Sequence, residues 1–580
     1  MEASESWTFR IPTLDRLQAS LPEPLDAAQI AKDWFHAFTE RIHDADATLQ
    51  LLCPDALWRD LLAFTWDMRT FVGQDKIRPF LKDRVAGSSF DRSEMTSFVQ
   101  LQKPFPDLAW IVAIFRFEVE AGGCCGVFRL VPTASGAWKA FTIFTSLDNL
   151  RGFPYEVGAL RRSNVVPGIR WSQHRREEVD CRDSDPVVLI VGAGQSALSL
   201  AARLKYLKVH TLMIEKDARV GDSWRRRYDS LCLHFPMADW LENYVNTLEL
   251  NVWTSTTVLD AAQAQDNTWN IRVQRSDNSI RNLRVRHLVM ATGVGDNVPN
   301  IPEIPGSGIY KGQVMHSIYY KSPQEFIGKR VTVIGAGNSA HDICSDLARE
   351  GIDVTMFQRG STFVMNMDKH WKFLGGALYR EDGPPTHIAD CLSQSMPHLL
   401  QAGGIAQRAT KAILKSQSDT VEKLKERGFR VGSGVKEAGV LLQIKERGGG
   451  HCFDTGSCQL IIDGKIKVKS DSQIRSFYEE GIEFDNGSRL ESDIVIYATG
   501  TGDMRQSIRQ ICGDKVADEC PPLIGVNDEG EMNWYRQLSR IGLWYMVGPF
   551  ALNRFYSNFL ALQIKAMEEN VMGARYSMDL

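Results

Sequence analysis

The chain has 580 residues, of which 43% are apolar and 24% are charged, so it can form two or three globular domains and is not a disordered protein. A formal net charge of −4 excludes a global basic field of the kind that attracts nucleic acid or an anionic membrane. The 11 cysteines include no Cys-x-x-Cys pair, which argues against a disulfide framework, a zinc ribbon or a thioredoxin-type redox pair. We find no signal-peptide pattern and no apolar run of bilayer length, and therefore expect a soluble, cytoplasmic protein without a metal site.

Residues 1–150 are expected to form an α+β domain of their own. A helical pattern over 26–42 and helix-like segments over 61–84 precede several alternating strand patterns. This order resembles the SnoaL-like cone, in which a curved sheet wraps a helix and leaves an apolar pocket. Two interpretations stay open for four residues, which either line the mouth of such a pocket or pack in the core: Trp58, Asp60, Trp66 and Asp67.

Residues 186–216 have the pattern of a βαβ unit that binds a dinucleotide. A continuous apolar run leads into Gly192, which permits the tight turn, and Gly194, which lets the backbone approach a pyrophosphate. Ala197 is small enough for the following helix to pack on the strand, and the helix N-terminus points at the phosphates. Glu215 ends the second strand, where a carboxylate can accept both ribose hydroxyls. This unit is therefore predicted to hold the adenosine end of FAD or NAD.

Residues 330–359 repeat this pattern at the same spacing. Gly335 and Gly337 form the turn, but the position of the first unit's acid holds Gln358, and Arg359 follows. An acid there would repel a 2′-phosphate, whereas Gln and Arg can donate hydrogen bonds to it, the guanidinium more strongly. The second nucleotide is therefore predicted to be NADPH. The first two residues of the following helix are also expected to contact it: Asn338 and Ser339.

Further short motifs accompany the two units. A Gly-x-x-Trp-Arg motif follows the first ribose acid, Leu-Cys-Leu-His-Phe-Pro occupies 231–236, and two Ala-Thr-Gly motifs end later strands. A fourth motif combines an aromatic residue, a glycine and a His-Ser pair in Tyr310, Gly312, His316 and Ser317. With these motifs the sequence resembles flavin-containing monooxygenases, including the plant YUCCA type and a fungal branch that carries an N-terminal SnoaL-like domain.

The resemblance implies cofactor contacts along these motifs. Those expected to contact the flavin or the pyridine nucleotide are Gly221, Trp224, Arg225, Gly293, His316, Ser317 and Gly500. His234 falls where many members have an Asn that hydrogen-bonds the oxygen adduct of the flavin, which makes it the candidate catalytic residue; the alternative is an ordinary loop histidine. For His316 the alternative is a hydrogen bond between domains. Tyr320 stands where Baeyer–Villiger members usually carry Trp, which disfavours a ketone-to-ester reaction.

The implied fold is α/β, with two Rossmann-like dinucleotide-binding domains of which the NADPH domain is inserted in the FAD domain, preceded by the SnoaL-like α+β domain. The expected boundaries are 1–150 for the SnoaL-like domain, 151–183 for a linker, 184–305 with 485–580 for the FAD domain, and 306–484 for the NADPH domain.

The implied function is an FAD- and NADPH-dependent monooxygenase that inserts one oxygen atom from O2 into a small organic substrate through a peroxyflavin. One departure complicates this implication, because relatives place some two dozen more residues after the position of Met237. An NADPH oxidase or a catalytically impaired flavin-binding scaffold is therefore the alternative. The sequence leaves the substrate and the oligomeric state open.

Overall fold

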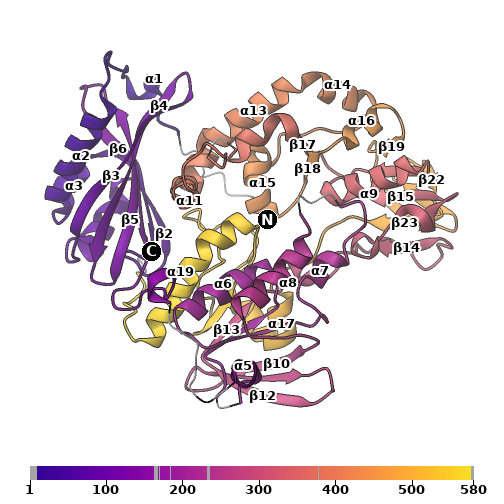
Figure 1. Ribbon diagram of the computed structural model, residues 1–580. Helices are drawn as coiled ribbons and strands as arrows, with labels where there is room; N and C mark the ends of the chain where they lie inside the picture. Colours follow the sequence, from indigo (N-terminus) through magenta and orange to yellow (C-terminus); the bar gives the residue numbers. More distant parts are fainter. Residues whose placement is uncertain are drawn as a thin grey trace.

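The computed structural model describes residues 10–161, 168, 170–182, 184–231, 235–376 and 378–576. Three parts are visible in Figure 1: an N-terminal part in indigo, a first α/β part at the bottom of the view, and a second α/β part with its helical insertion at the top and right. The long yellow helix near the end of the chain lies between the first two parts.

The N-terminal part is a six-stranded sheet with helices packed on it. The strand order is β2-β1-β6-β5-β4-β3, and β1 and β6 are the parallel pair. Helix α2 buries Trp34, Phe35 and Phe38 at helical spacing, and the ring centroids of Trp34 and Phe128 are 4.6 Å apart. The elements are α1 (Leu14–Leu17), α2 (Ala27–Arg41), α3 (Ala45–Gln50), β1 (Leu52–Leu61), β2 (Met68–Val72), α4 (Gln74–Phe80), η1 (Leu81–Val85), β3 (Asp91–Phe105), β4 (Leu108–Val119), β5 (Gly122–Pro132) and β6 (Trp138–Leu147).

The helix-like interpretation of residues 61–84 is wrong in its first half, because 68–72 form β2 and helix begins only at Gln74. Residues 68–72 are almost entirely buried. A short buried run has the same periodicity in a strand as in a helix, so the sequence pattern does not distinguish the two. Antiparallel pairing with β1 makes these residues a strand.

The linker region contains a docked helix. The described residues form η2 (Gly158–Leu160) and α5 (Trp171–Asp180). Arg175 Nη2 donates to the Leu250 carbonyl at 2.8 Å, and Trp253 Nε1 donates to the Val179 carbonyl at 2.7 Å. Helix α5 is therefore fixed to the first α/β part.

The first α/β part is built on a parallel five-stranded sheet of order β24-β13-β7-β8-β9. Helix α6 crosses from β7 to β8 and packs against α19 and α8, as Figure 1 shows. A small antiparallel sheet, β10-β11-β12, lies beside it. The elements are β7 (Val188–Val191), α6 (Gln195–Tyr206), β8 (Thr211–Ile214), α7 (Asp222–Arg225), α8 (Met237–Leu248), β9 (Val252–Trp253), β10 (Thr257–Gln263), β11 (Trp269–Gln274), β12 (Ile280–Val285), β13 (His287–Met290), η3 (Val294–Asn297), α17 (Gln506–Cys512), α18 (Asp514–Glu519), β24 (Leu543–Tyr545) and α19 (Phe550–Glu568).

The second α/β part repeats this plan. Its parallel sheet has the order β14-β23-β15-β16-β19, with α9 crossing from β15 to β16 and a small antiparallel sheet β20-β21-β22 beside it. The elements of the repeat are β14 (Gln313–His316), η4 (Ser317–Tyr319), η5 (Pro323–Phe326), β15 (Arg330–Ile334), α9 (Asn338–Arg349), β16 (Asp353–Phe357), β19 (Ile466–Lys469), β20 (Ile474–Tyr478), β21 (Gly481–Phe484), β22 (Arg489–Glu491) and β23 (Ile494–Tyr497).

A mainly helical insertion separates β16 from β19. Its elements are β17 (Phe363–Asn366), α10 (Met367–His370), η6 (Trp371–Leu374), α11 (Thr386–Gln394), α12 (His398–Leu400), η7 (Gln401–Ile405), α13 (Ala406–Ser416), α14 (Ser418–Glu426), η8 (Val435–Glu437), α15 (Gly439–Arg447), β18 (His451–Asp454) and α16 (Ser457–Ile462). Helix α16 in this insertion packs against α9 and α14.

One expected domain boundary, the return to the FAD domain at residue 485, differs from the sheet topology. Strand β23 was expected in the FAD domain, which was to resume at residue 485, but it lies between β14 and β15 in the second sheet. The hairpin β21–β22 likewise stays with the second part. The chain therefore returns to the first part only after Gly500. A strand in the middle of a sheet is placed by partners that are distant in sequence, which local patterns do not record.

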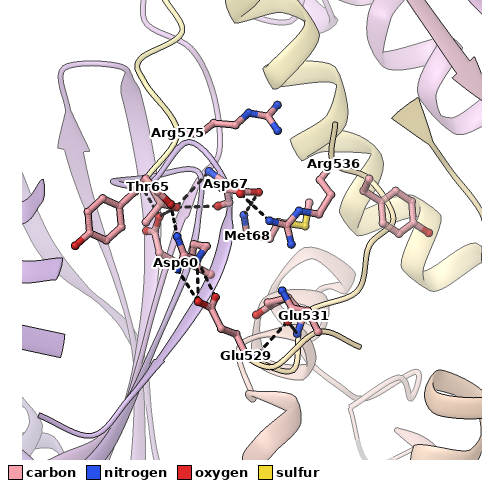
Figure 2. A network of polar contacts seen from close by, with 12 residues as sticks. Asp60, Thr65, Asp67, Met68, Glu529, Glu531, Arg536 and Arg575 are labelled. Carbon is pink, nitrogen blue, oxygen red and sulfur yellow. Dashed lines mark hydrogen bonds and ion pairs between the residues drawn. The ribbon is translucent and has the colours of Figure 1, made fainter. Parts of the chain in front are cut away.

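Buried ion pairs join the N-terminal sheet to the segment before β24. Arg59 on β1 contacts Glu531 at 2.6 Å, Arg69 on β2 contacts Glu529 at 2.6 Å, and Arg536 contacts Asp67 at 2.6 Å. Figure 2 shows this network at the boundary of the two parts. One continuous apolar core also runs from the N-terminal sheet into the first α/β part, whereas the second has cores of its own. The first two parts are therefore one packed unit.

Candidate dinucleotide sites

The first glycine turn passes close to the end of the neighbouring strand. Gly192 has a φ of +103°, and a Cβ at this position would lie 2.6 Å from the carbonyl oxygen of Ala291. No other residue fits there without strain. Gly194 is different, because a Cβ on it would meet nothing within 4 Å. Ala197 is completely buried in α6, as its packing role requires. The turn therefore has an open face in front of the N-terminus of α6, which suits a phosphate.

Glu215 lies at the end of β8, beside this turn. Its Oε2 accepts from the Ala193 N–H at 2.9 Å, and its Oε1 accepts from the Asp217 N–H at 3.0 Å. Burial raises the pKa of Glu215, and these two hydrogen bonds oppose the shift. A carboxylate has about four acceptor positions, so two hydrogen bonds leave capacity for ribose hydroxyls. Glu215 is therefore fixed beside the first glycine turn.

The motif after Glu215 forms the short helix α7 on α8. Gly221 has a φ of +90°, and a Cβ there would lie 2.5 Å from the Ala238 carbonyl oxygen. Arg225 contacts Asp222, Asp239 and Glu242. The expected cofactor ligand Arg225 is thus held by three carboxylates, and its guanidinium fixes α7 to α8. The expected ligand Trp224 is half-buried and packs against the apolar core that the first α/β part shares with the N-terminal part. The candidate catalytic residue His234 lies outside the described residues.

The second glycine turn repeats the geometry of the first. Gly335 has a φ of +133°, and a Cβ there would overlap the Ala498 carbonyl oxygen, the counterpart of Ala291. Gly337 again has room for a Cβ, its nearest neighbour being a backbone oxygen 3.7 Å away. Asn338 and Ser339 open α9 and border a cavity of about 1320 Å³. The two turns thus use the same close approach to an Ala-Thr-Gly motif.

The two residues at the end of β16 have different roles. Gln358 is completely buried; its Nε2 donates to Thr362 Oγ1 at 3.1 Å and to the Arg430 carbonyl at 2.9 Å, and its Oε1 accepts from the Arg430 N–H. The expectation that Gln358 donates to a 2′-phosphate is therefore wrong, because its amide is fully used in the fold. Arg359 is exposed, borders the cavity and has no ion-pair partner among the described residues. Arg359 is the side chain that remains available for a phosphate.

The lining of this cavity is strongly basic. No aspartate or glutamate borders it among the described residues, while seven cationic side chains do: Lys216, Arg225, Arg226, Arg227, Lys321, Arg359 and Arg447. Several of these pair with acids outside the lining, such as Arg226 with Asp217. A cavity of this size and charge fits a ligand with several phosphate groups.

His316 ends β14 and contacts the segment that follows the neighbouring strand β23 of the same sheet. Its Nδ1 accepts from the Ile318 N–H at 3.3 Å, so the neutral ring carries its proton on Nε2, which donates to the Gly500 carbonyl at 3.0 Å. Burial lowers the pKa of His316 and favours this neutral form. Both partners belong to the second part, so this contact is not the hydrogen bond between domains that was the alternative for His316. Ser317 borders the cavity beside it.

Two tyrosines that the sequence analysis did not single out as ligands or linkers contact α9, Tyr228 from the first part and Tyr320 from within the second. Tyr228 donates to Asp342 at 2.5 Å, and Tyr320 donates to Asp346 at 2.7 Å. The two acids are four residues apart on one face of α9, a spacing that could have indicated a polar contact face. Tyr320, which was considered only as a substitute for Trp, is thus buried and hydrogen-bonded to α9.

The glycines of the two Ala-Thr-Gly motifs both have left-handed backbone, with φ of +93° at Gly293 and +81° at Gly500. Thr501 Oγ1 donates to the Val294 carbonyl at 3.1 Å, and Tyr545 OH donates to the Gly293 carbonyl at 2.9 Å. The ends of the two central strands therefore meet where the chain crosses between the parts.

The N-terminal residues considered for a pocket mouth fall into two groups. Trp58 and Asp60 are completely buried, and burial raises the pKa of Asp60 to about 6 although Thr145 and Thr65 donate to it. Trp66 borders a surface hollow of about 650 Å³, and Asp67 contacts Arg536. The core interpretation therefore holds for Trp58 and Asp60. In the described part of the chain, no three His, Cys, Asp or Glu residues group as a metal site, and no helix is long and apolar enough to cross a membrane.

The fold thus contains two equivalent βαβ units of the Rossmann type, each with a glycine turn against an Ala-Thr-Gly motif. The profile of the pyridine nucleotide-disulphide oxidoreductase family matches residues 234–372. Indole-3-pyruvate monooxygenase YUCCA1 of Oryza sativa subsp. japonica is 27% identical over 341 residues, 54% of this chain and 76% of the relative. Probable indole-3-pyruvate monooxygenase YUCCA4 of Arabidopsis thaliana is 28% identical over 352 residues, 55% of this chain and 78% of the relative.

By sequence, the chain is therefore similar to flavin-containing monooxygenases of the YUCCA type, the resemblance that its motifs predicted. Two solved structures are also similar. A flavin-containing monooxygenase from Stenotrophomonas maltophilia has a TM-score of 0.44 at 16% identity, covering 66% of this chain and 99% of that one. A cyclohexanone monooxygenase has a TM-score of 0.46 at 15% identity, covering 67% and 88%. These structural likenesses are distant.

Proposed function

We propose that the protein is an FAD- and NADPH-dependent monooxygenase that inserts one oxygen atom from O2 into a small organic substrate. The observation that carries this proposal is the pair of equivalent glycine turns, one beside the acid Glu215 and the other beside the exposed guanidinium of Arg359. The first unit, with the segment after Gly500, is proposed to hold FAD, and the second to hold NADPH. The relatives named above are monooxygenases of this family.

The chain's own residues bind and orient in this proposal. Gly192 and Glu215 receive the pyrophosphate and ribose of FAD, and Gly335 with Arg359 receives those of NADPH. The hydrogen bond of Tyr228 to Asp342 joins the two units. A bound flavin would supply the redox chemistry, taking electrons from NADPH and activating dioxygen. The protein's contribution is to place the two cofactors against each other and to exclude water.

Oxygen transfer is tested directly with labelled dioxygen. We expect the purified protein to bind FAD, to oxidise NADPH in the presence of a small nucleophilic or oxo-acid substrate, and to place one atom of 18O2 in the product. Mass spectrometry of the product and the absorbance of NADPH are the measurements. Unlabelled product with NADPH consumption, or a protein that takes up no FAD, would contradict the proposal.

An NADPH oxidase is the second candidate because one flank of the first unit is open. Helix α8 begins directly after Pro236, where relatives carry a longer segment. Phe235 and Trp240 are each 44% exposed, and Trp240 makes an edge contact with Phe550 at the start of α19. An open flank would let water reach the flavin. In the labelling experiment, hydrogen peroxide equal to the NADPH consumed identifies the oxidase, and a colourless protein identifies a scaffold.

The Arg359→Ala variant is expected to separate NADPH from NADH. Losing a charged hydrogen bond to the 2′-phosphate costs about 1.5–3 kcal/mol, which is a factor of roughly 10 to 100 in affinity. The KM for NADPH should rise by this factor, and that for NADH should stay within about twofold. Steady-state kinetics with both nucleotides are the measurement, and Arg489→Ala, on an exposed hairpin with its own partner Glu483, is the control. An equal change for both nucleotides would remove the assignment.

The N-terminal part is proposed to be a SnoaL-like cone whose interior is filled by side chains. In support, its six-stranded sheet packs on α2, and Trp58 and Asp60 occupy its core. The proposed domain ranges are those expected from the sequence, except that 485–500 belongs to the NADPH unit. The cytoplasmic location, and the absence of nucleic-acid and membrane partners, stay predictions.

A further inference from the structure

The loop between α15 and β18 faces the second glycine turn and is not explained by the contacts described above. Its sequence is Arg447-Gly448-Gly449-Gly450-His451. The carbonyl oxygen of His451 lies 3.7 Å from the position of a Cβ on Gly337. Gly448 and Gly450 have φ values of +67° and +86°, which residues other than glycine rarely adopt. The loop conformation that brings His451 to the start of α9 therefore depends on these glycines.

Hydrogen bonds of Asn338 fix the position of the proton on the His451 ring. Asn338 Oδ1 accepts from the Phe453 N–H at 2.7 Å, so its amide nitrogen is the atom that faces His451 Nε2 at 3.3 Å. An amide nitrogen can only donate, so Nε2 accepts and the neutral ring carries its proton on Nδ1. Burial lowers the pKa of His451 to about 4, which keeps the ring neutral near pH 7.

The Nδ1–H group of His451 is a buried donor in need of an acceptor. The residue is 8% exposed, the Nδ1 atom has no hydrogen-bond partner among the described residues, and the residue borders the basic cavity. Buried donors in folded proteins are almost always paired. Arg447, at the other end of the loop, is exposed at the same cavity and has no ion-pair partner in the described part of the chain. Both groups suit an anion at the N-terminus of α9.

We propose that this loop is the second half of a diphosphate site, in which His451 donates through Nδ1 to a phosphate oxygen held at the first turn of α9 and Arg447 adds a positive charge. The inference rests on the proposed function only for the identity of the nucleotide, because the group recognised is the diphosphate. NADPH and NADH share that group. His451 therefore sets affinity for both nucleotides, whereas Arg359 selects between them.

Two substitutions of His451 separate the two ring nitrogens. His451→Gln places an amide near Nε2, where its oxygen can accept from Asn338, and removes the donor at Nδ1. His451→Asn reaches only as far as Nδ1 and can keep the donor. Calorimetric titration of the full chain with NADP+, NAD+ and inorganic pyrophosphate should give about tenfold weaker binding of all three for the Gln variant. The Asn variant should stay within about threefold of the native chain, and thermal unfolding checks that both variants fold.

Arg447→Ala provides an independent measurement on an exposed residue. It should weaken binding of the same three ligands, and the effect should shrink as salt is raised from 0.05 to about 0.5 M, because exposed charges are screened. A Gln variant as tight as the native chain, or an Asn variant as weak as the Gln variant, would overturn the role of His451. An Arg447→Ala variant with unchanged affinity at low salt would overturn that of Arg447.

The probes also separate this inference from the proposed function. If pyrophosphate binds in a manner that depends on His451 while neither dinucleotide binds, the loop site stands and the NADPH assignment falls. If both dinucleotides bind without dependence on His451, the loop inference falls and the proposed function stands. A native chain that binds none of the three overturns both.

Discussion

A Gly335→Ala variant is expected to lose NADPH binding and to keep FAD, whereas Gly192→Ala is expected to do the reverse. Each methyl group would push against a carbonyl oxygen of the neighbouring Ala-Thr-Gly motif, Ala498 in one case and Ala291 in the other. Each residue would also be held at a positive φ, which costs roughly 1–2 kcal/mol for a non-glycine residue. Moving the turn displaces the backbone that the pyrophosphate must approach, so we expect affinity to fall at least about tenfold at the altered site. Flavin content and NADP+ titration are the measurements.

Gly337→Ala and Gly194→Ala are the matched controls for strain. At both positions a Cβ meets no atom closer than 3.7 Å, and neither glycine has a positive φ. The free energy of unfolding of these variants should lie within about 0.5 kcal/mol of that of the native chain. Each variant should nevertheless bind its own cofactor more weakly, because the methyl group occupies the open face of the turn. Unchanged affinity in both would show that the ligand does not lie on these faces.

Arg59→Met is expected to destabilise the packed unit of the first two parts by about 3–5 kcal/mol, because it leaves a buried carboxylate without its partner. The side chains of Arg59 and Glu531 are 7% and 3% exposed and lie 2.6 Å apart, and Arg59 also donates to Tyr556 OH at 2.9 Å. Chemical denaturation followed by tryptophan fluorescence measures the loss. The second α/β part has cores of its own, so the affinity for NADP+ should change little.

The exposed pair Arg272–Asp260 serves as the control for Arg59. Its side chains are 57% and 43% exposed, so Arg272→Met should lower the free energy of unfolding far less than Arg59→Met does. Burial by itself would raise the pKa of Glu531, but Arg59 holds it below its usual value. A carboxylate with a depressed pKa contributes stability above its unfolded pKa and loses it as the pH falls. The Arg59 effect should therefore diminish below about pH 4.5; a difference that is independent of pH would contradict the ion-pair account.

The cofactor turns were predictable because their requirements are local. A glycine that must pass a neighbouring strand, an apolar run before it and an acid at the next strand end are written within some thirty residues, as in 186–216 and 330–359. The structure places Gly192, Gly335 and Glu215 as expected. The prediction that Gln358 donates to a phosphate was wrong because its amide hydrogen-bonds the backbone of Arg430, which is distant in sequence.

The sequence by itself determined the two βαβ units, their order and the different residues at the ends of their second strands, because glycine conformation and strand-end residues are properties of short segments. Only the tertiary structure decided that β23 belongs to the second sheet, that Arg225 is held by acids, and that His451 faces the second turn. Each of these depends on which segments far apart in the chain become neighbours. That choice is made by burial and hydrogen bonding of the whole fold, which no local pattern contains.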